Sequence, residues 1–136
     1  MTNFADIVRK TICHHRLRVR KWRSNMSGSA WQVRYGDGRV IRWIEAPYPR
    51  TPLSLAIFLH EVGHHVIGFE CYKRRCEEEY HAWKWALDEM RRLKIEPTDK
   101  VLNRYNLSMQ YAVGKALRRG IKTLPVTLKE FEPKAA

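Results

Sequence analysis

The feature that most constrains the fold of this chain is a change of hydrophobic pattern at three prolines between residues 47 and 52. Before them, residues 16–23 alternate apolar and basic side chains, and residues 30–35 and 40–44 flank a Gly-Asp-Gly sequence. Period-two alternation is typical of strands with one buried face, and a short glycine turn between two such segments favours a hairpin. The prolines end this region because proline has no backbone N–H to donate to a sheet.

After these prolines the apolar residues recur at helical spacing. We expect helices over residues 52–67, 77–94 and 98–119, and a shorter helix over residues 4–15. A strand block followed by a helix block predicts an α+β fold, with an N-terminal helix and a small three-stranded antiparallel or mixed sheet followed by a three-helix block. The length of 136 residues favours a single domain.

The residues that carry chemistry form a short motif, His60-Glu61-Val62-Gly63-His64, inside the predicted helix 52–67. Residues four apart stand on the same face of a helix, so two imidazoles can hold one zinc ion from one side. Glu61 can then act as general base toward a water molecule whose pKa the zinc ion lowers. Gly63 leaves room for another element to approach closely. The alternative is a pair of core histidines with a chance glutamate, although burying these groups without partners is costly.

A catalytic zinc site needs a third protein ligand and an open fourth position. On a wheel at about 100° per residue, Glu79 falls within the apolar arc of the predicted helix 77–94, Glu78 at its edge and His81 to one side. The arc is defined by Ala82, Trp83, Ala86, Met90 and Leu93. A carboxylate that points into an apolar face needs a partner, and zinc is a suitable one. Glu79 is therefore the first choice for the third ligand, and His81 is the second because imidazole binds zinc equally well.

The two segments together resemble a known family. The pattern His60-Glu61-x-Gly63-His64 followed by Glu79-x-x-Ala82-x-x-Trp85-Ala86 is similar to that of the ImmA/IrrE-type metallopeptidases and of related small phage and plasmid proteins. That family belongs to the gluzincins, as do the very small minigluzincins. The resemblance covers about residues 29–90. After Ala86 the chain departs from the pattern, because it lacks the Leu-Met-Pro ending that is common in the ImmA group.

The resemblance implies a zincin-like metallopeptidase domain over residues 1–136 that binds one Zn²⁺ per chain. It implies that His60, His64 and Glu79 are the zinc ligands, in agreement with the wheel, and that Glu61 is the catalytic base. The expected reaction is cleavage of a peptide bond in a protein or peptide substrate.

The sequence does not decide two further parts of such a site, the rim of the cleft and the oxyanion donor. The strand before the motif, residues 40–44, would form the rim of the cleft and offer an edge where a substrate strand could add. An interior strand with Trp43 in the core is an equal alternative. A transition-state oxyanion would need a hydrogen-bond donor, and the sequence does not select among Tyr105, Tyr111 and His65.

The formal charge of +12 favours a partner that is acidic, either nucleic acid or an acidic protein. The excess is spread along the chain rather than confined to a tail. Arg16, Arg18 and Arg20 are expected on one face of the first strand with Trp22 beside them, which would suit contacts to a nucleic-acid backbone and base stacking. The alternative is a solvated outer face, with Leu17 and Val19 on the buried side.

Two other readings compete with catalysis. Cys71, Cys76 and His81, with either His64 or His65, could form a closed structural zinc site in a basic nucleic-acid-binding module. Such a site would leave Glu61 and Glu79 without a role. The second alternative is a catalytically silent zincin-like scaffold. In it, the basic segment after the last predicted helix folds over the cleft.

The cellular location is indicated only by signals that the sequence lacks. The longest nearly apolar run, residues 53–59, is far shorter than the roughly 20 residues that cross a bilayer. The N-terminus has neither the basic start nor the apolar stretch of a secretion signal. We therefore expect a soluble, cytoplasmic protein with no membrane association and with free cysteines. Nothing in the sequence indicates an oligomeric state.

Overall fold

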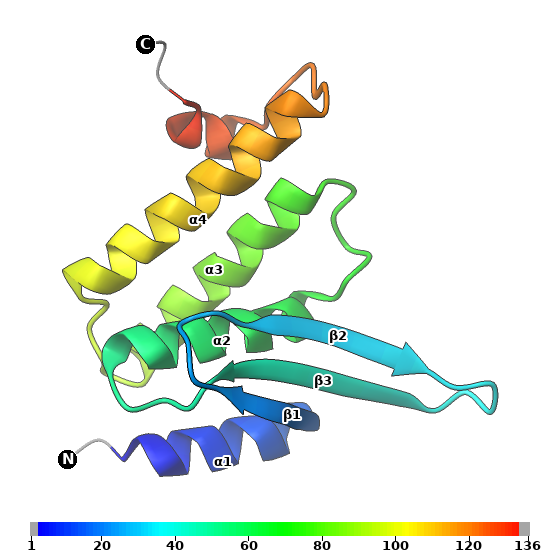
Figure 1. Cartoon of the computed structure of the whole chain (residues 1–136), viewed down its shortest axis with the longest axis vertical. Coiled ribbons are helices and arrows are strands. Elements are labelled where there is room, and N and C mark those ends of the chain that lie inside the picture. The colour runs from blue at the N-terminus through cyan, green and yellow to red at the C-terminus, as the bar shows by residue number, and fades with distance from the viewer. Residues whose placement is uncertain (1–2, 134–136) are drawn as a thin grey trace.

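The computed structural model describes residues 3–133 and has the expected α+β architecture. Its elements in chain order are α1 (Phe4–His15), β1 (Leu17–Arg23), β2 (Ser29–Arg34), β3 (Val40–Pro47), α2 (Pro52–Ile67), α3 (Arg75–Arg92), α4 (Asp99–Arg118) and the 3-10 helix η1 (Val126–Phe131). Figure 1 shows α1 and the sheet at one end of the molecule, α2 beside the sheet, and α3 and then α4 toward the other end. The N-terminal helix, the three-stranded mixed sheet and the helices after it are confirmed.

The sheet has the strand order β1-β3-β2, with β1 parallel and β2 antiparallel to β3. The central strand β3 also carries buried residues at its C-terminal end, where Ile44 and Ala46 are fully buried beside α2. A central strand has both edges hydrogen-bonded, so it has no free edge for another strand. The expectation that residues 40–44 form a free rim is therefore wrong, and β1 and β2 are the edges of the sheet.

The arginines predicted on one face of β1 do not form a continuous row. Arg16 lies before the strand, in a left-handed conformation (φ 54°) that ends α1, and the pairing with β3 shifts register between Val19 and Lys21. A register shift re-aims the side chains that follow it. Arg18 and Arg20 are exposed, and Arg20 pairs with Glu45. Trp22 packs edge-on against Tyr48 and at a tilt against Phe58, instead of lying beside the arginines as a stacking surface.

Helix α2 runs through the centre of the molecule and begins where the sequence predicts. Thr51 and Ser54 form a reciprocal capping box at its start, with Pro52 in the first turn. The residues from Leu55 to Leu59 are almost completely buried between β3 and α3. The helix ends at Gly68, whose N–H donates to the carbonyl of His64. A helix buried on nearly all sides is held in one position, which fixes the direction of the side chains in its second half.

Helices α3 and α4 complete the helical part by packing in sequence on α2 and on each other. Helix α3 begins and ends two residues earlier than predicted, because the chain leaves the helix at Leu93 and Lys94 adopts a positive φ of 62°. The segment after α4 contains η1, whose Leu128 and Phe131 are buried against α4. Within residues 3–133, none of the helices combines the length and the apolar character needed to cross a bilayer.

Candidate metal centre

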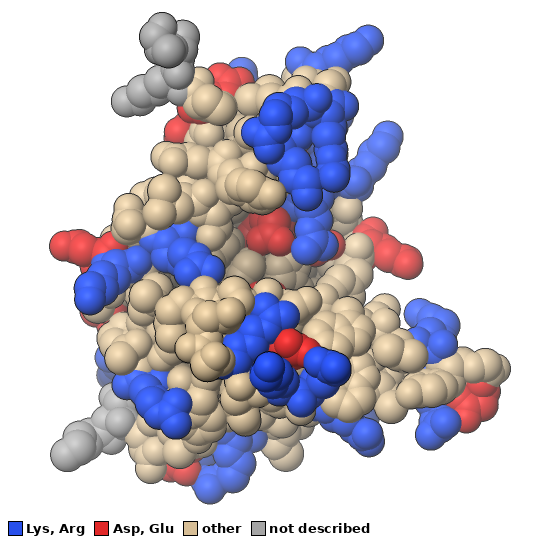
Figure 2. Space-filling model, viewed as in Figure 1, with Lys and Arg blue, Asp and Glu red and all other residues tan. Residues whose placement is uncertain are grey.

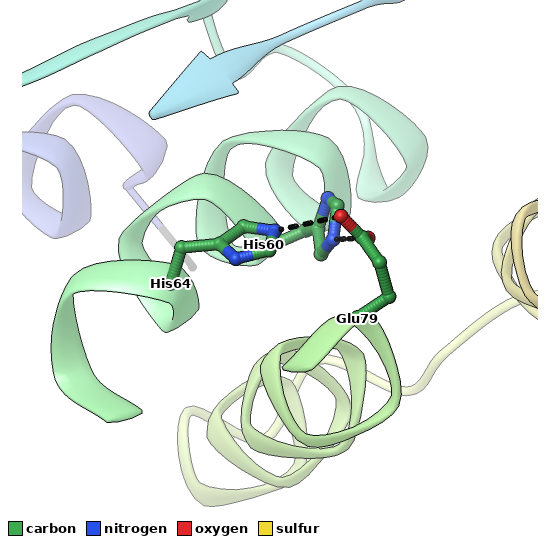
Figure 3. Close-up of side chains that lie close together, drawn as sticks. All are labelled: His60, His64 and Glu79. Atoms are coloured by element: carbon green, nitrogen blue, oxygen red, sulfur yellow. Dashed lines mark hydrogen bonds and ion pairs between the residues drawn. The ribbon is translucent and has the colours of Figure 1, made fainter. Parts of the chain in front are cut away.

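The structure brings His60, His64 and Glu79 together at the contact between α2 and α3. The two imidazoles stand on one face of α2, as their spacing of four residues requires, and Glu79 reaches them from the first turns of α3. Nε2 of His60 lies 2.9 Å from one oxygen of the Glu79 carboxylate, and Nε2 of His64 lies 3.2 Å from the other. Figure 3 shows both rings directed toward this carboxylate.

These three side chains fit the requirements of a metal site. One ligand atom from each lies within 4.8 Å of the others, and no other such group of histidine, cysteine or acidic residues occurs within residues 3–133. Ligands of a tetrahedral zinc ion, each about 2.1 Å from it, are about 3.4 Å apart, which lies within the 4.8 Å that encloses one ligand atom from each residue. Two imidazole nitrogens and one carboxylate are a donor set that leaves a fourth position open. The cluster could therefore hold one divalent metal ion.

A close approach of the α2 and α3 backbones brings Glu79 to the two histidines. A Cβ atom placed on Gly63 would lie 2.6 Å from the carbonyl oxygen of Ala82 and 3.2 Å from its Cα. Only glycine allows α3 to approach α2 so closely. Gly63 follows the first histidine by three residues, and Ala82 follows Glu79 by three, so this contact lies one turn from the cluster. The role expected for Gly63 is confirmed.

His64 has a second carboxylate partner that the sequence did not reveal. Nδ1 of His64 lies 2.7 Å from Glu78, whose side chain is only 5% exposed, compared with 17% for Glu79. When Nδ1–H donates to Glu78, a metal ion can take the place of the proton that Nε2 shares with Glu79. The wheel placed Glu78 at the edge of the buried arc, but α2 covers that edge as well. The run Glu77-Glu78-Glu79 was the only sequence signal for such a partner. It does not show which glutamate is the metal ligand and which one contacts Nδ1 of His64.

Ring stacking orients His60, and ion pairs with Arg75 hold the two glutamates. The ring of His60 stacks on Trp83, with 4.4 Å between ring centroids and an interplanar angle of 13°. The guanidinium of Arg75 lies 3.1 Å from Glu78 and 3.3 Å from Glu79. Burial by itself would raise the pKa of Glu79, but hydrogen bonds from His60 and His64 outweigh it and hold this pKa well below its usual range. Glu79 is therefore ionised, as a metal ligand must be.

Glu61 lies beside the cluster in a buried position. Its carboxylate is 3.6 Å from Nδ1 of His60, and only 6% of its side chain is exposed. Burial raises the pKa of Glu61, and the nearby His60 and His64 only partly offset this effect. Gly28, between β1 and β2, covers it: a Cβ atom on Gly28 would lie 2.7 Å from both Cγ and Oε2 of Glu61. The connection between two strands thus closes one side of the candidate base.

The second choice for third ligand lies elsewhere. His81 stacks on Tyr72 with 4.2 Å between ring centroids, away from the α2 histidines. Cys76 is buried in the core and Cys71 is exposed, so the structure does not assemble the alternative cysteine–histidine zinc site. The physical reason is that both histidines are engaged elsewhere: His64 is held between Glu78 and Glu79, and His65 is hydrogen-bonded to the carbonyl oxygen of Trp43.

The three candidate oxyanion donors are also separated by the fold. Nε2 of His65 lies 2.9 Å from the carbonyl oxygen of Trp43, so its N–H anchors α2 to β3. Tyr105 packs edge-on against Phe131, and burial raises its pKa to about 12. Tyr111 lines a large cleft beside Glu79 and is 66% exposed. Of the three, Tyr111 alone lies where a bound molecule would reach it.

The arrangement as a whole can bind a divalent cation and place a buried carboxylate beside it, next to an open cleft. Comparison with protein-family models, with curated proteins and with solved structures finds no match to this chain.

Proposed function

We propose that the protein is a zinc-dependent, metallopeptidase-like hydrolase with a zincin-like site, acting on a protein or peptide substrate. The observation that carries this proposal is the convergence of His60, His64 and Glu79 with Glu61 buried alongside. A structural zinc site has four protein ligands, whereas this cluster supplies three. The resemblance of the motifs to ImmA/IrrE-type metallopeptidases supports the same assignment.

Each residue has a distinct task in the proposed reaction. His60, His64 and Glu79 would hold the ion, which when bound supplies Lewis acidity and lowers the pKa of a coordinated water. Glu61 accepts the proton of the attacking water and passes it to the leaving amine. Its burial and the cover from Gly28 keep bulk water away from this carboxylate.

Two further residues orient this site. Glu78 would accept the Nδ1–H of His64 and so direct Nε2 to the metal, and Trp83 fixes the plane of the His60 ring. Both contacts are present in the structure, so the two rings are already oriented toward Glu79.

The proposal is tested by metal analysis and by hydrolysis of a fluorescently quenched casein. We expect about one zinc ion per chain in the wild-type protein and none in His60→Ala. Glu61→Gln should keep the metal and lose hydrolysis by a factor on the order of 10² to 10⁴. His81→Ala is the matched control, since it removes an imidazole outside the cluster, and it should retain both properties. A protein without zinc, or hydrolysis that survives Glu61→Gln, contradicts the proposal.

A further inference from the structure

A cleft of about 1190 Å³ opens beside the candidate metal centre. Its wall is formed by the start of α3, by α4 from Arg104 onward and by the residues that follow α4. Glu79 belongs both to the metal cluster and to this wall, and Gly28, which covers Glu61, lies on it too. A molecule lying in the cleft would therefore meet the site where hydrolysis is proposed.

The charge of this wall is strongly one-sided. Six basic residues line it: Arg74, Arg75, Arg104, Lys115, Arg119 and Lys122. Glu79 is the one acidic residue on the described wall, and it is already engaged by the two histidines. Figure 2 shows Lys and Arg gathered over the end of α4 and the segment after it, above a hollow with acidic atoms at its base.

Most of these cations have no ion-pair partner among the residues that the structure describes. Arg75 pairs with Glu78 and Glu79, and Arg74 is 3.7 Å from Glu77. The other four, on α4 and after it, form no ion pair within residues 3–133. Four unpaired positive charges around one concave surface focus a positive potential into it and favour an anionic ligand.

The uncharged part of the wall distinguishes between anionic ligands. It includes four aliphatic side chains, Leu107, Ala112, Ala116 and Ile121. Leu107 is 55% exposed, which leaves apolar surface open to a ligand. Tyr111 is the one aromatic residue on the described wall, whereas single-stranded nucleic acids are held by several aromatic side chains that stack on successive bases. Aliphatic surface between cations instead fits a peptide that interleaves apolar and acidic side chains.

We propose that the cleft binds an acidic, partly apolar peptide segment and presents it to the metal centre, so that the substrates of this protein carry acidic residues next to the cleaved bond. This inference rests on the proposed function for the cleavage step, but the binding step can be measured without it. The four unpaired cations receive the carboxylates of the peptide, and the aliphatic residues receive its apolar side chains.

The test measures binding by fluorescence anisotropy at physiological ionic strength, with Glu61→Gln protein, with and without added zinc, so that no probe is consumed. The probes are a short labelled peptide that interleaves Glu with Leu and Ser, the same peptide with Gln for every Glu, and an oligothymidylate of equal charge. The cleft variant is Lys115→Glu with Lys122→Glu. The matched control is Lys10→Glu with Lys21→Glu, which makes the same charge change at exposed residues outside the cleft.

The expected result is binding of the acidic peptide that weakens about tenfold or more in the cleft variant and by less than about twofold in the control. The Gln peptide should bind at least about tenfold more weakly than the acidic one. Equal losses in both variants would mean a general charge effect and overturn the proposal. So would no binding of the acidic peptide, equal binding of the Gln peptide, or tighter cleft-dependent binding of the oligothymidylate.

Cleavage of both peptides by the wild-type enzyme separates the two proposals. If the acidic peptide binds in the cleft but no zinc is held and nothing is cleaved, the proposed function fails and the peptide site stands. If the protein cleaves the Gln peptide as fast as the acidic one in a zinc-dependent reaction, the proposed function stands and acidic selectivity is refuted.

Discussion

Replacing Gly63 with alanine tests directly how the metal centre is assembled, because Gly63 is the point of closest contact between α2 and α3. The new methyl group would lie 2.6 Å from the carbonyl oxygen of Ala82. A carbon and a carbonyl oxygen in contact are normally about 3.3 Å or more apart, so the helices must separate locally by about 0.7 Å. The obstacle is backbone within a helix, which cannot move aside as a flexible side chain can.

The magnitude follows from two opposing effects. Alanine is favoured over glycine inside a helix by about 1 kcal/mol. Forcing a methyl group against fixed backbone costs up to about 3 kcal/mol, so Gly63→Ala should destabilise the protein by about 2 kcal/mol. Gly114 is the matched control, since it is also a buried helical glycine. Its new methyl group would meet only the end of the Arg118 side chain, at 3.4 Å, so Gly114→Ala should stabilise by about 1 kcal/mol.

The assay is urea unfolding in the presence of chelator, followed by a zinc titration of each protein. With a slope of about 2 kcal/mol per M, the midpoint should fall by about 1 M for Gly63→Ala and rise by about 0.5 M for Gly114→Ala. Zinc affinity should fall only for Gly63→Ala, because only this change moves Glu79 relative to the two histidines. A Gly63→Ala protein as stable as the wild type would refute the account of the helix contact.

Two other predictions test the surroundings of the site. Glu78→Gln should weaken zinc binding about 10- to 100-fold in a chelator competition, because the carboxylate that fixes the His64 tautomer is lost; unchanged affinity would show that Glu78 does not position His64. Arg20 and Arg23 hold the pKa of Glu45 below its usual value near 4.5. Since this pKa is depressed in the folded protein, the ion pairs stabilise it above that value and lose their effect as the pH falls. Urea midpoints at pH 6 and pH 3.5 should therefore differ less for Glu45→Gln than for the wild type, and an identical pH dependence would contradict this role.

The sequence by itself determined those parts of the site that depend on neighbours within one helix. His60 and His64 share a face of α2 because a helix turns once in 3.6 residues, whatever surrounds it. The apolar arc of the next helix pointed to Glu79 as their partner, and the structure brings it to both imidazoles. The small size of Gly63 likewise predicted a close approach at that position, although not by which residue.

The tertiary structure decided everything that depends on how separate elements pack. The sequence ranked His81 as an alternative ligand. The position of α3 instead stacks His81 on Tyr72 and brings Glu78 into contact with His64. The strand order placed β3 in the centre of the sheet, and a register shift in β1 broke the expected row of arginines. The cleft joins cations from the start of α3 with cations from α4 and the segment after it, which are separate in the sequence. Spacing along a helix fixes directions only within that helix, whereas distances between elements follow from the packing of the whole core.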